Sequence, residues 1–144
     1  RISNTNLINS NLKYCLVTKT KVPMKIDGTN VKPNDINDFV DFENLLQCNN
    51  LEDYAGVGIS IQASNICAID VDHCFNVAND INSIDERGKS ILDKFKDIAY
   101  CEFSFSGTGL RILFKADIID DYSDKYYIKN SNQDIYYTNY FIKR

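Results

Sequence analysis

Short apolar runs and alternating apolar and polar positions dominate the chain, a pattern typical of β-strands. In residues 110–115 the alternation separates two faces. Leu110, Ile112 and Phe114 share one face, and Arg111, Leu113 and Lys115 share the other. The same reasoning predicts further strands at 13–17, 56–61, 66–71 and 100–105, and two short ones within 133–142 around Thr138 and Asn139.

Two segments instead show helical spacing. In 34–47, four apolar residues form one stripe: Phe39, Phe42, Leu45 and Leu46. A second helix is expected over about 84–96, with a capping box formed by Ser83 and Glu86 and with Gly88 inside it. Two helices and six or seven strands make the expected fold class α+β.

The strand at 66–71 is expected to pair with 56–61 in an antiparallel hairpin, and it carries the main candidate site. Successive strand side chains point to opposite faces, so Asp70 and Asp72 should share one face. Their Cα atoms would lie roughly 6.5–7 Å apart. Two carboxylates at that separation can grip one or two divalent cations, and oxygen ligands favour Mg²⁺ or Mn²⁺. His73 should point to the opposite face as a packed or hydrogen-bonded structural histidine.

Two further features suit phosphate chemistry. The turn Ser104-Phe105-Ser106-Gly107-Thr108-Gly109 offers backbone N–H groups and hydroxyls, and Arg111 follows on the next strand, where a guanidinium can pair with a phosphate. A third acid, Asp134, opens a late strand and could complete a metal pair. Nucleotidyl transfer needs such parts: cations for the triphosphate, a cationic clamp and a positioned nucleophile.

Composition narrows the classes of function. The chain has 144 residues and a formal net charge of −4, which argues against tight sequence-specific DNA binding by this segment alone. Its five cysteines lack Cys-x-x-Cys spacing and His73 is the only histidine, so we expect buried thiols in a reducing, cytoplasmic compartment and no zinc site. No apolar run is long enough for a membrane span.

Residues 1–12 are rich in Asn and Ser and are expected to be a linker or lead-in. Residues 13–144 are expected to form a single domain. The chain begins at Arg1 without an initiator Met and ends at Arg144 inside an aromatic run, so we expect it to be a fragment of a longer protein.

In order and spacing, these motifs resemble the primase–polymerase (prim-pol) domain of the archaeo-eukaryotic primase superfamily, as found in phage, plasmid and mobile-element replication proteins. The resemblance covers about residues 14–142. Its pieces are Lys21-Val22-Pro23, Phe42-Glu43, Tyr54-Ala55-Gly56-Val57-Gly58, Ala68-Ile69-Asp70-Val71-Asp72-His73-Cys74, Ser104 to Ile112, and Asp134-Ile135-Tyr136.

The resemblance implies an RRM-like antiparallel catalytic sheet with flanking helices, joined to a smaller N-terminal α/β unit. It implies that Asp70, Asp72 and Asp134 hold two Mg²⁺ or Mn²⁺ ions. Ser104, Ser106, Gly107 and Thr108 match the turn that holds the incoming nucleotide, together with Arg111. The implied activity is template-directed primer synthesis and extension from nucleoside triphosphates on single-stranded DNA. Members of this family often carry a helicase domain C-terminal to this region.

Arg111 departs from the family pattern, which normally has His at that position. Arginine keeps a positive charge and hydrogen-bond donors, but it cannot exchange a proton near pH 7 as imidazole does. The alternative hypothesis is therefore a prim-pol-like module that has lost its chemistry and binds nucleic acid or a partner in replication initiation. A Toprim-type nuclease or primase also uses Asp-x-Asp, but it needs a separate upstream acid at a strand end. Glu52 and Asp53 lie in a loop instead.

Overall fold

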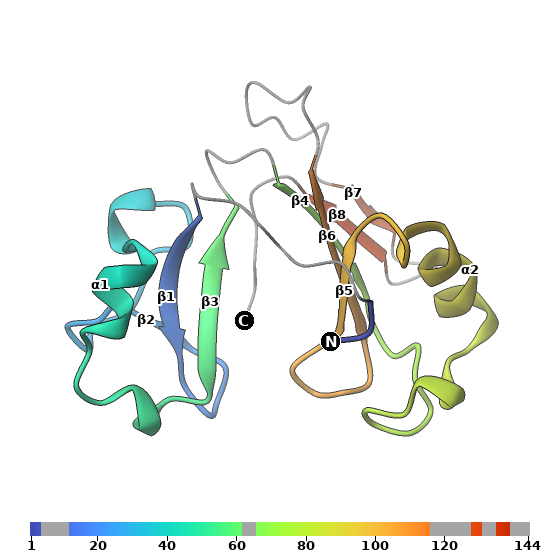
Figure 1. The fold of residues 1–144 in the computed structure, drawn as a ribbon, viewed down its shortest axis with the longest axis horizontal. Coiled ribbons are helices and arrows are strands. Elements are labelled where there is room, and N and C mark those ends of the chain that lie inside the picture. The colour runs from blue at the N-terminus through green and yellow to red at the C-terminus, as the bar shows by residue number, and fades with distance from the viewer. Residues whose placement is uncertain (4–11, 62–65, 116–127, 131–134, 139–144) are drawn as a thin grey trace. The chain divides into compact units, whose positions relative to one another are not determined.

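The computed structural model describes residues 1–3, 12–61, 66–115, 128–130 and 135–138. The chain divides into two compact units. The first, here the five-stranded unit, contains residues 1–8 and 65–139; the second, the three-stranded unit, contains 9–64 and 140–144. Each has its own antiparallel sheet, which makes the fold α+β as expected (Figure 1).

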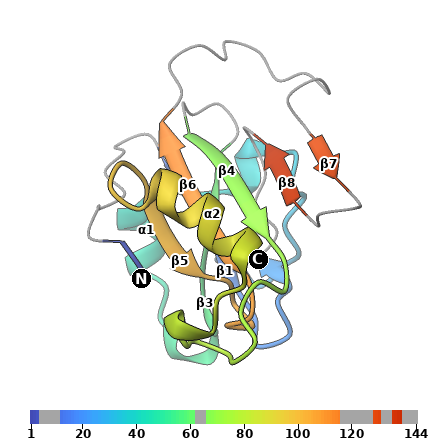
Figure 2. The same ribbon diagram turned by 90° about the vertical axis from the view of Figure 1, so that its right-hand side faces the viewer.

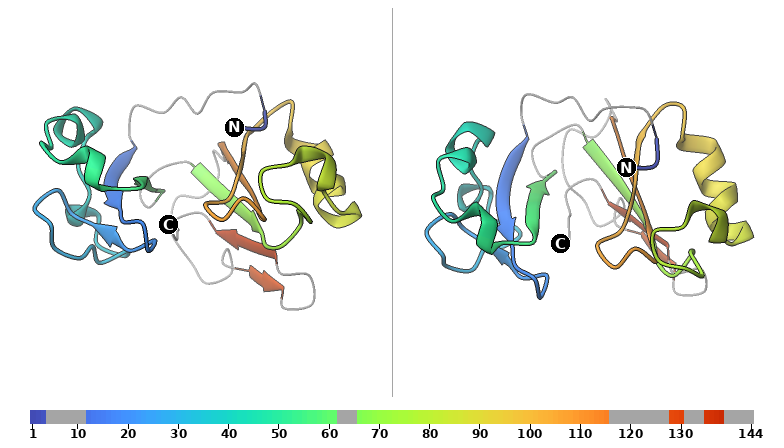
Figure 3. Two further views of the ribbon diagram at one scale, coloured as in Figure 1. Left: turned by 90° about the horizontal axis from the view of Figure 1, so that it is seen from below. Right: turned by 60° about the horizontal axis from the view of Figure 1, so that its bottom comes forward.

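The three-stranded unit is built around β1. Its strands are β1 (Lys13–Val17), β2 (Pro23–Met24) and β3 (Gly56–Ser60), in the order β2-β1-β3. The short helix α1 (Phe42–Leu46) packs beside β1 (Figure 3), and the tilted rings of Tyr14 and Phe42 contact each other with centroids 5.2 Å apart. Gly58 permits close approach inside this sheet, because a Cβ there would lie 2.8 Å from the Cys15 sulfur.

The single helix predicted over 34–47 is wrong. The structure has a 3₁₀ turn, η1 (Ile36–Asp38), then extended backbone at Phe39 and Val40, then α1. Asp35 caps η1, and the Val40 backbone exchanges two hydrogen bonds with Tyr14 on β1. A β-branched residue favours this extended pairing, so pairing with a strand distant in sequence overrides the helical spacing. A second 3₁₀ turn, η2 (Leu51–Asp53), precedes β3.

The five-stranded unit has β4 at its centre. Its strands are β4 (Ile66–Val71), β5 (Tyr100–Phe103), β6 (Leu110–Lys115), β7 (Ile128–Asn130) and β8 (Ile135–Thr138). They are antiparallel neighbours in the order β5-β6-β4-β8-β7. The helix α2 (Glu86–Phe95) connects β4 to β5, and β6 is inserted between these two strands, which makes a split βαβ motif.

The predicted hairpin of 56–61 with 66–71 is also wrong, because β3 pairs with β1 in one sheet and β4 pairs with β6 and β8 in the other. Both segments are apolar enough to pair, and nearness in sequence suggested that they pair with each other. Five of the six β4 residues are apolar and buried, with exposures of 8% or less. A strand of that kind needs neighbours on both edges, and β6 and β8 provide them.

One face of the five-stranded sheet packs against α2 (Figure 2). The core between them is apolar and contains Ile69, Val71, Cys74, Phe75, Leu92, Ala99, Cys101, Leu110 and Ile112. The helix begins at Asp85, whose carboxylate accepts from the Gly88 N–H at 2.6 Å, and not at the capping box predicted from Ser83. Ser83 ends the 3₁₀ turn η3 (Ile81–Ser83). Position 88 of the helix requires glycine, because a Cβ there would lie only 2.7 Å from the Cβ of Cys74.

The first residues add to the edge of β5. The Ile2 N–H donates to the Cys101 carbonyl at 2.7 Å, and the buried Ser3 hydroxyl donates to the Ala99 carbonyl at 2.8 Å. All five cysteines are free thiols, and four of them are buried, as predicted. Within the described part of the chain, no helix has the length and apolar character needed to cross a membrane.

Candidate functional site

The two central acids lie where β4 ends. Asp70 is the penultimate residue of the strand, and its side chain is 22% exposed. Asp72 follows the last strand residue, the fully buried Val71, and so belongs to a turn. His73 is exposed in that turn with φ at 53°, which corrects the expectation of a packed structural histidine. The turn redirects the chain so that the next residue, Cys74, enters the core.

Strand register places Asp70 directly opposite Arg111 on β6, and Arg111 directly opposite Glu102 on β5. The guanidinium lies 3.7 Å from Asp70 Oδ2 and 3.7 Å from Glu102 Oε1. These are ion-pair distances, longer than hydrogen bonds. Arg111 is only 8% exposed. A buried cation needs partners of this kind. Asp70, Arg111 and Glu102 therefore form a row of three charges across three neighbouring strands.

This row occupies the sheet face opposite to α2. The neighbouring positions Ile69, Val71, Leu110 and Ile112 all point into the core beneath that helix. Because strand side chains alternate, Asp70 and Arg111 point to the other face. The alternation predicted for 110–115 is therefore confirmed for the core positions Leu110 and Ile112, and the register adds that Arg111 meets a carboxylate on each side.

The turn between β5 and β6 satisfies most of its own polar groups. The Ser104 hydroxyl accepts from the Gly109 N–H at 2.9 Å, and the Gly107 N–H donates to the Ser104 carbonyl at 2.8 Å. A chain of hydroxyls runs from Ser104 through Ser106 to Thr108, with oxygen separations of 3.1 and 2.9 Å. These backbone N–H groups already have partners, so the exposed Ser106 and the half-buried Thr108 hydroxyls are the better candidates for contact with a phosphate.

A neighbouring loop fixes the turn. The Phe75 N–H donates to the Thr108 carbonyl and the Asn79 N–H to the Gly107 carbonyl, each at 3.0 Å. Gly107 has φ at +79°, and a Cβ there would lie 2.8 Å from the Asn79 side chain. The rings of Phe75 and Phe103 contact each other in a tilted arrangement, with centroids 4.8 Å apart. The loop that follows Asp72 and the turn that precedes Arg111 are therefore held together.

The turn also touches the end of β4. Val71 pairs with Leu110, and a Cβ on Gly109 would lie 3.0 Å from the Val71 carbonyl oxygen. One end of the sheet thus brings together the residues next to Asp70, the turn from Ser104 to Gly109, and Arg111. Of the residues predicted from the sequence, Asp70 and Arg111 form an ion pair, and the turn adjoins the ends of their two strands.

Asp134 lies outside the described residues. The strand that begins one residue later, β8, pairs with β4, and Ile135 lies opposite Val71 while Tyr136 lies opposite Asp70. Among the residues that the structure does describe, no three histidines, cysteines or acids gather closely enough to hold a metal ion. Asp70 and Asp72 provide oxygen donors of the kind that Mg²⁺ and Mn²⁺ prefer, and this donor set fits such an ion.

Sequence reasoning missed two residues of the site. Glu102 lies two residues before the turn, as Arg111 lies two residues after it, and this symmetry could have singled it out. Arg87, in the first turn of α2, donates from Nη2 to the Asp72 carbonyl at 2.6 Å and lies 3.7 Å from Asp85. This second contact holds the backbone of Asp72. It could not be predicted from the sequence, because it depends on how the chain folds between β4 and α2.

Several groups in the five-stranded unit have pKa values raised by burial. Burial, followed by the nearby Glu102 carboxylate, raises the pKa of Tyr100 to about 12. The phenol therefore stays protonated and donates to Glu102 Oε2 at 2.9 Å. Burial also raises the pKa of the Cys74 thiol to about 11, and it raises the pKa values of Cys67 and Cys101. Nucleophilic cysteine chemistry in the five-stranded unit is therefore disfavoured.

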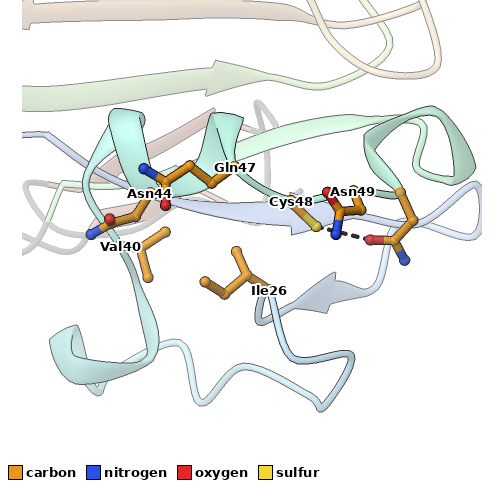
Figure 4. Close-up of a pocket in the computed structure, with 7 residues that line it drawn as sticks. Ile26, Val40, Asn44, Gln47, Cys48 and Asn49 are labelled. Atoms are coloured by element: carbon orange, nitrogen blue, oxygen red, sulfur yellow. Dashed lines mark hydrogen bonds between the residues drawn. The ribbon is translucent and has the colours of Figure 1, made fainter.

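A cavity of about 450 Å³ lies in the three-stranded unit (Figure 4). Amides dominate its lining, which consists of Ile26, Val40, Asn44, Gln47, Cys48, Asn49 and Asn50. The Cys48 thiol donates to the Asn50 side-chain oxygen at 2.9 Å. Because this lining carries no charged side chain, the cavity lacks the groups needed to bind a metal–triphosphate complex.

Comparison with protein-family models gives no match, and comparison with curated proteins gives no significant one.

Proposed function

We propose that the chain is a template-directed nucleotidyltransferase, a primase–polymerase that forms and extends primers from nucleoside triphosphates in the replication of a mobile element, phage or virus. The single observation that carries the proposal is the grouping at one end of the five-stranded sheet. Asp70 lies against Arg111, and the hydroxyl-bearing turn adjoins both strands. Carboxylates, a cation and hydroxyl donors in one place are the parts that phosphoryl transfer uses.

The order of strands supports the same proposal. Leaving β7 aside, the order β5-β6-β4-β8 with α2 between β4 and β5 is that of a ferredoxin-like or RRM-like sheet, with its first strand at the centre. The catalytic sheet of the prim-pol family is of this kind. Asp70 and Arg111 lie on the two central strands of such a sheet, on the face that α2 leaves uncovered.

The proposal gives each residue a role. Asp70, Asp72 and Asp134 would hold two Mg²⁺ or Mn²⁺ ions, which when bound lower the pKa of the attacking 3′-hydroxyl and neutralise the triphosphate. The hydroxyls of Ser106 and Thr108 donate to phosphate oxygens, while Ser104 and Gly107 hold the turn in shape. Arg111 adds positive charge beside the phosphates. Single-stranded DNA is the proposed template, and a helicase domain is the proposed neighbour in a longer chain.

The test is a primer-synthesis and primer-extension assay with Mn²⁺ or Mg²⁺. We expect Asp70→Asn and Asp72→Asn each to lower incorporation by at least about a hundredfold, because each removes a charged metal ligand while keeping the side-chain shape. Asp97→Asn is the matched control, since Asp97 is an exposed acid in the turn after α2. Circular dichroism and urea unfolding confirm that each variant folds. Wild-type incorporation by both site variants would contradict the proposal.

One observation favours the second candidate, a module that binds without chemistry. Arg111 stands at the family's histidine position and forms an ion pair with Asp70, a proposed metal ligand. A guanidinium fixed there competes with a metal ion for the Asp70 carboxylate. Calorimetric titration with a nucleoside triphosphate and Mn²⁺ separates the two candidates. Metal-dependent binding supports the enzyme, and nucleic-acid or partner binding without it supports the module.

A further inference from the structure

Glu102 and Tyr100 form an anchored acid beside Arg111. Both lie on β5, two residues apart, so they share the sheet face that also carries Arg111. The Tyr100 hydroxyl donates to Glu102 Oε2 at 2.9 Å, and the other carboxylate oxygen, Oε1, lies 3.7 Å from the Arg111 guanidinium. Each Glu102 oxygen therefore has its own neighbour, and the tyrosine fixes the direction of the carboxylate.

Arg111 is shared between two acids by this arrangement. Asp70 Oδ2 and Glu102 Oε1 lie at the same distance, 3.7 Å, from two different nitrogens of the guanidinium. Opposite charges attract more strongly as they approach, and each acid limits how closely the cation can move to the other. If Glu102 lost its charge, its attraction for the guanidinium would be lost, and the guanidinium would shift toward Asp70. A metal ion at Asp70 would then have to displace a tighter ion pair.

We infer that Glu102, oriented by Tyr100, is a positioning residue that holds Arg111 away from Asp70 and so leaves the Asp70 carboxylate accessible to a divalent cation. The inference rests on the proposed function, since it requires a metal at Asp70. It also explains how an arginine can replace the family's histidine without blocking the site. Glu102, which lies opposite Arg111 on the next strand, attracts the guanidinium and offsets its attraction to Asp70.

The experiment measures Mn²⁺ binding to the whole chain by calorimetry, without nucleotide and without turnover. We expect Glu102→Gln to weaken Mn²⁺ binding by about threefold to fivefold, the scale of a partly exposed ion pair. Tyr100→Phe should weaken binding in the same direction by a smaller factor. Arg111→Gln should strengthen binding, because it removes the competing cation. Asp97→Asn, which also removes one negative charge from this unit, should leave binding unchanged.

The double variant Glu102→Gln/Arg111→Gln distinguishes positioning from a general loss of negative charge. If Glu102 acts through Arg111, the double variant binds Mn²⁺ within about twofold of Arg111→Gln alone. If Glu102→Gln weakens binding equally in both backgrounds, or not at all in the wild-type background, the inference is overturned while the proposed function stands. If wild type binds no Mn²⁺, or if Asp70→Asn binds as tightly as wild type, the proposed function and the inference both fail.

Discussion

At the scale of single residues, Gly107 shows how one position fixes the turn of the candidate site. Its φ of +79° is in the left-handed region, which costs other residues about 1–2 kcal/mol. Its α-carbon also faces the Asn79 side chain with no room for a methyl group. A side chain at this position would push the turn away from the loop that follows Asp72.

We therefore expect Gly107→Ala to lower the free energy of unfolding by about 2–3 kcal/mol, the sum of backbone strain and overpacking. Urea unfolding followed by tyrosine fluorescence measures this loss. The variant Asn79→Gly removes the opposing side chain, so the double variant should recover about 1 kcal/mol and retain the backbone cost. Strictly additive losses would show that the two residues do not touch.

The contrast between Arg111 and Glu102 shows what single residues in the sequence could reveal. Arg111 could be singled out because it follows a Gly-rich turn. Its environment could not be predicted, because Asp70 and Glu102 reach it only through the register of three strands. Alternation gives the face of a residue, but pairing decides which residues meet. Asp134 remains a prediction, since it lies outside the described residues.

At the scale of elements, α1 is a five-residue helix stabilised by its contacts. Leu45 is its buried residue, 1% exposed, whereas the adjacent Leu46 is 57% exposed. So short a helix is not stable by itself in water, so its position depends on the packing of Leu45 and on the contact of Phe42 with Tyr14.

We expect Leu45→Ala to lower the free energy of unfolding by about 2–5 kcal/mol, the range for a buried leucine. Leu46→Ala is a matched control at the next position and should change it by no more than about 0.5 kcal/mol. Chemical denaturation of both variants gives the comparison. Equal effects at the two positions would mean that α1 does not pack as described.

The sequence predicted the strands at 13–17, 66–71 and 110–115 well, because their alternation and apolar runs reflect a buried face. It failed at 34–47, where Val40 pairs with Tyr14 and interrupts the helix. It also failed for the hairpin, since two neighbouring strands joined different sheets. Both failures concern long-range pairing, which local periodicity does not contain.

At the scale of the whole molecule, buried ionisable groups link stability to alkaline pH. Burial raises the pKa of Cys15 and of Cys74 from 9.0 to about 11, and it raises that of Tyr100 from 10.0 to about 12. Above pH 9 the unfolded chain therefore loses protons that the folded chain retains. Fewer bound protons in the unfolded state mean that stability falls as pH rises.

We expect the midpoint of urea unfolding to be flat from pH 7 to 8 and to decrease steadily between pH 9 and 11. The variant Cys15→Ala should show a shallower decrease relative to its own value at pH 7, because it lacks one of the thiols whose pKa is raised by burial. A midpoint that stays constant or increases over this interval would contradict the burial of these thiols.

The central place of β4 has a consequence for how the protein is made. Both strands that flank it, β6 and β8, come later in the chain, and the second ends only at Thr138. During synthesis this apolar strand leaves the ribosome long before its partners, with both edges open to pairing with other chains. A product that stops before Ile135 lacks β8, so the edge of β4 next to Asp70 stays permanently unpaired. Premature termination should therefore yield aggregates, and the newly made chain is most vulnerable at the strand that carries the proposed chemistry.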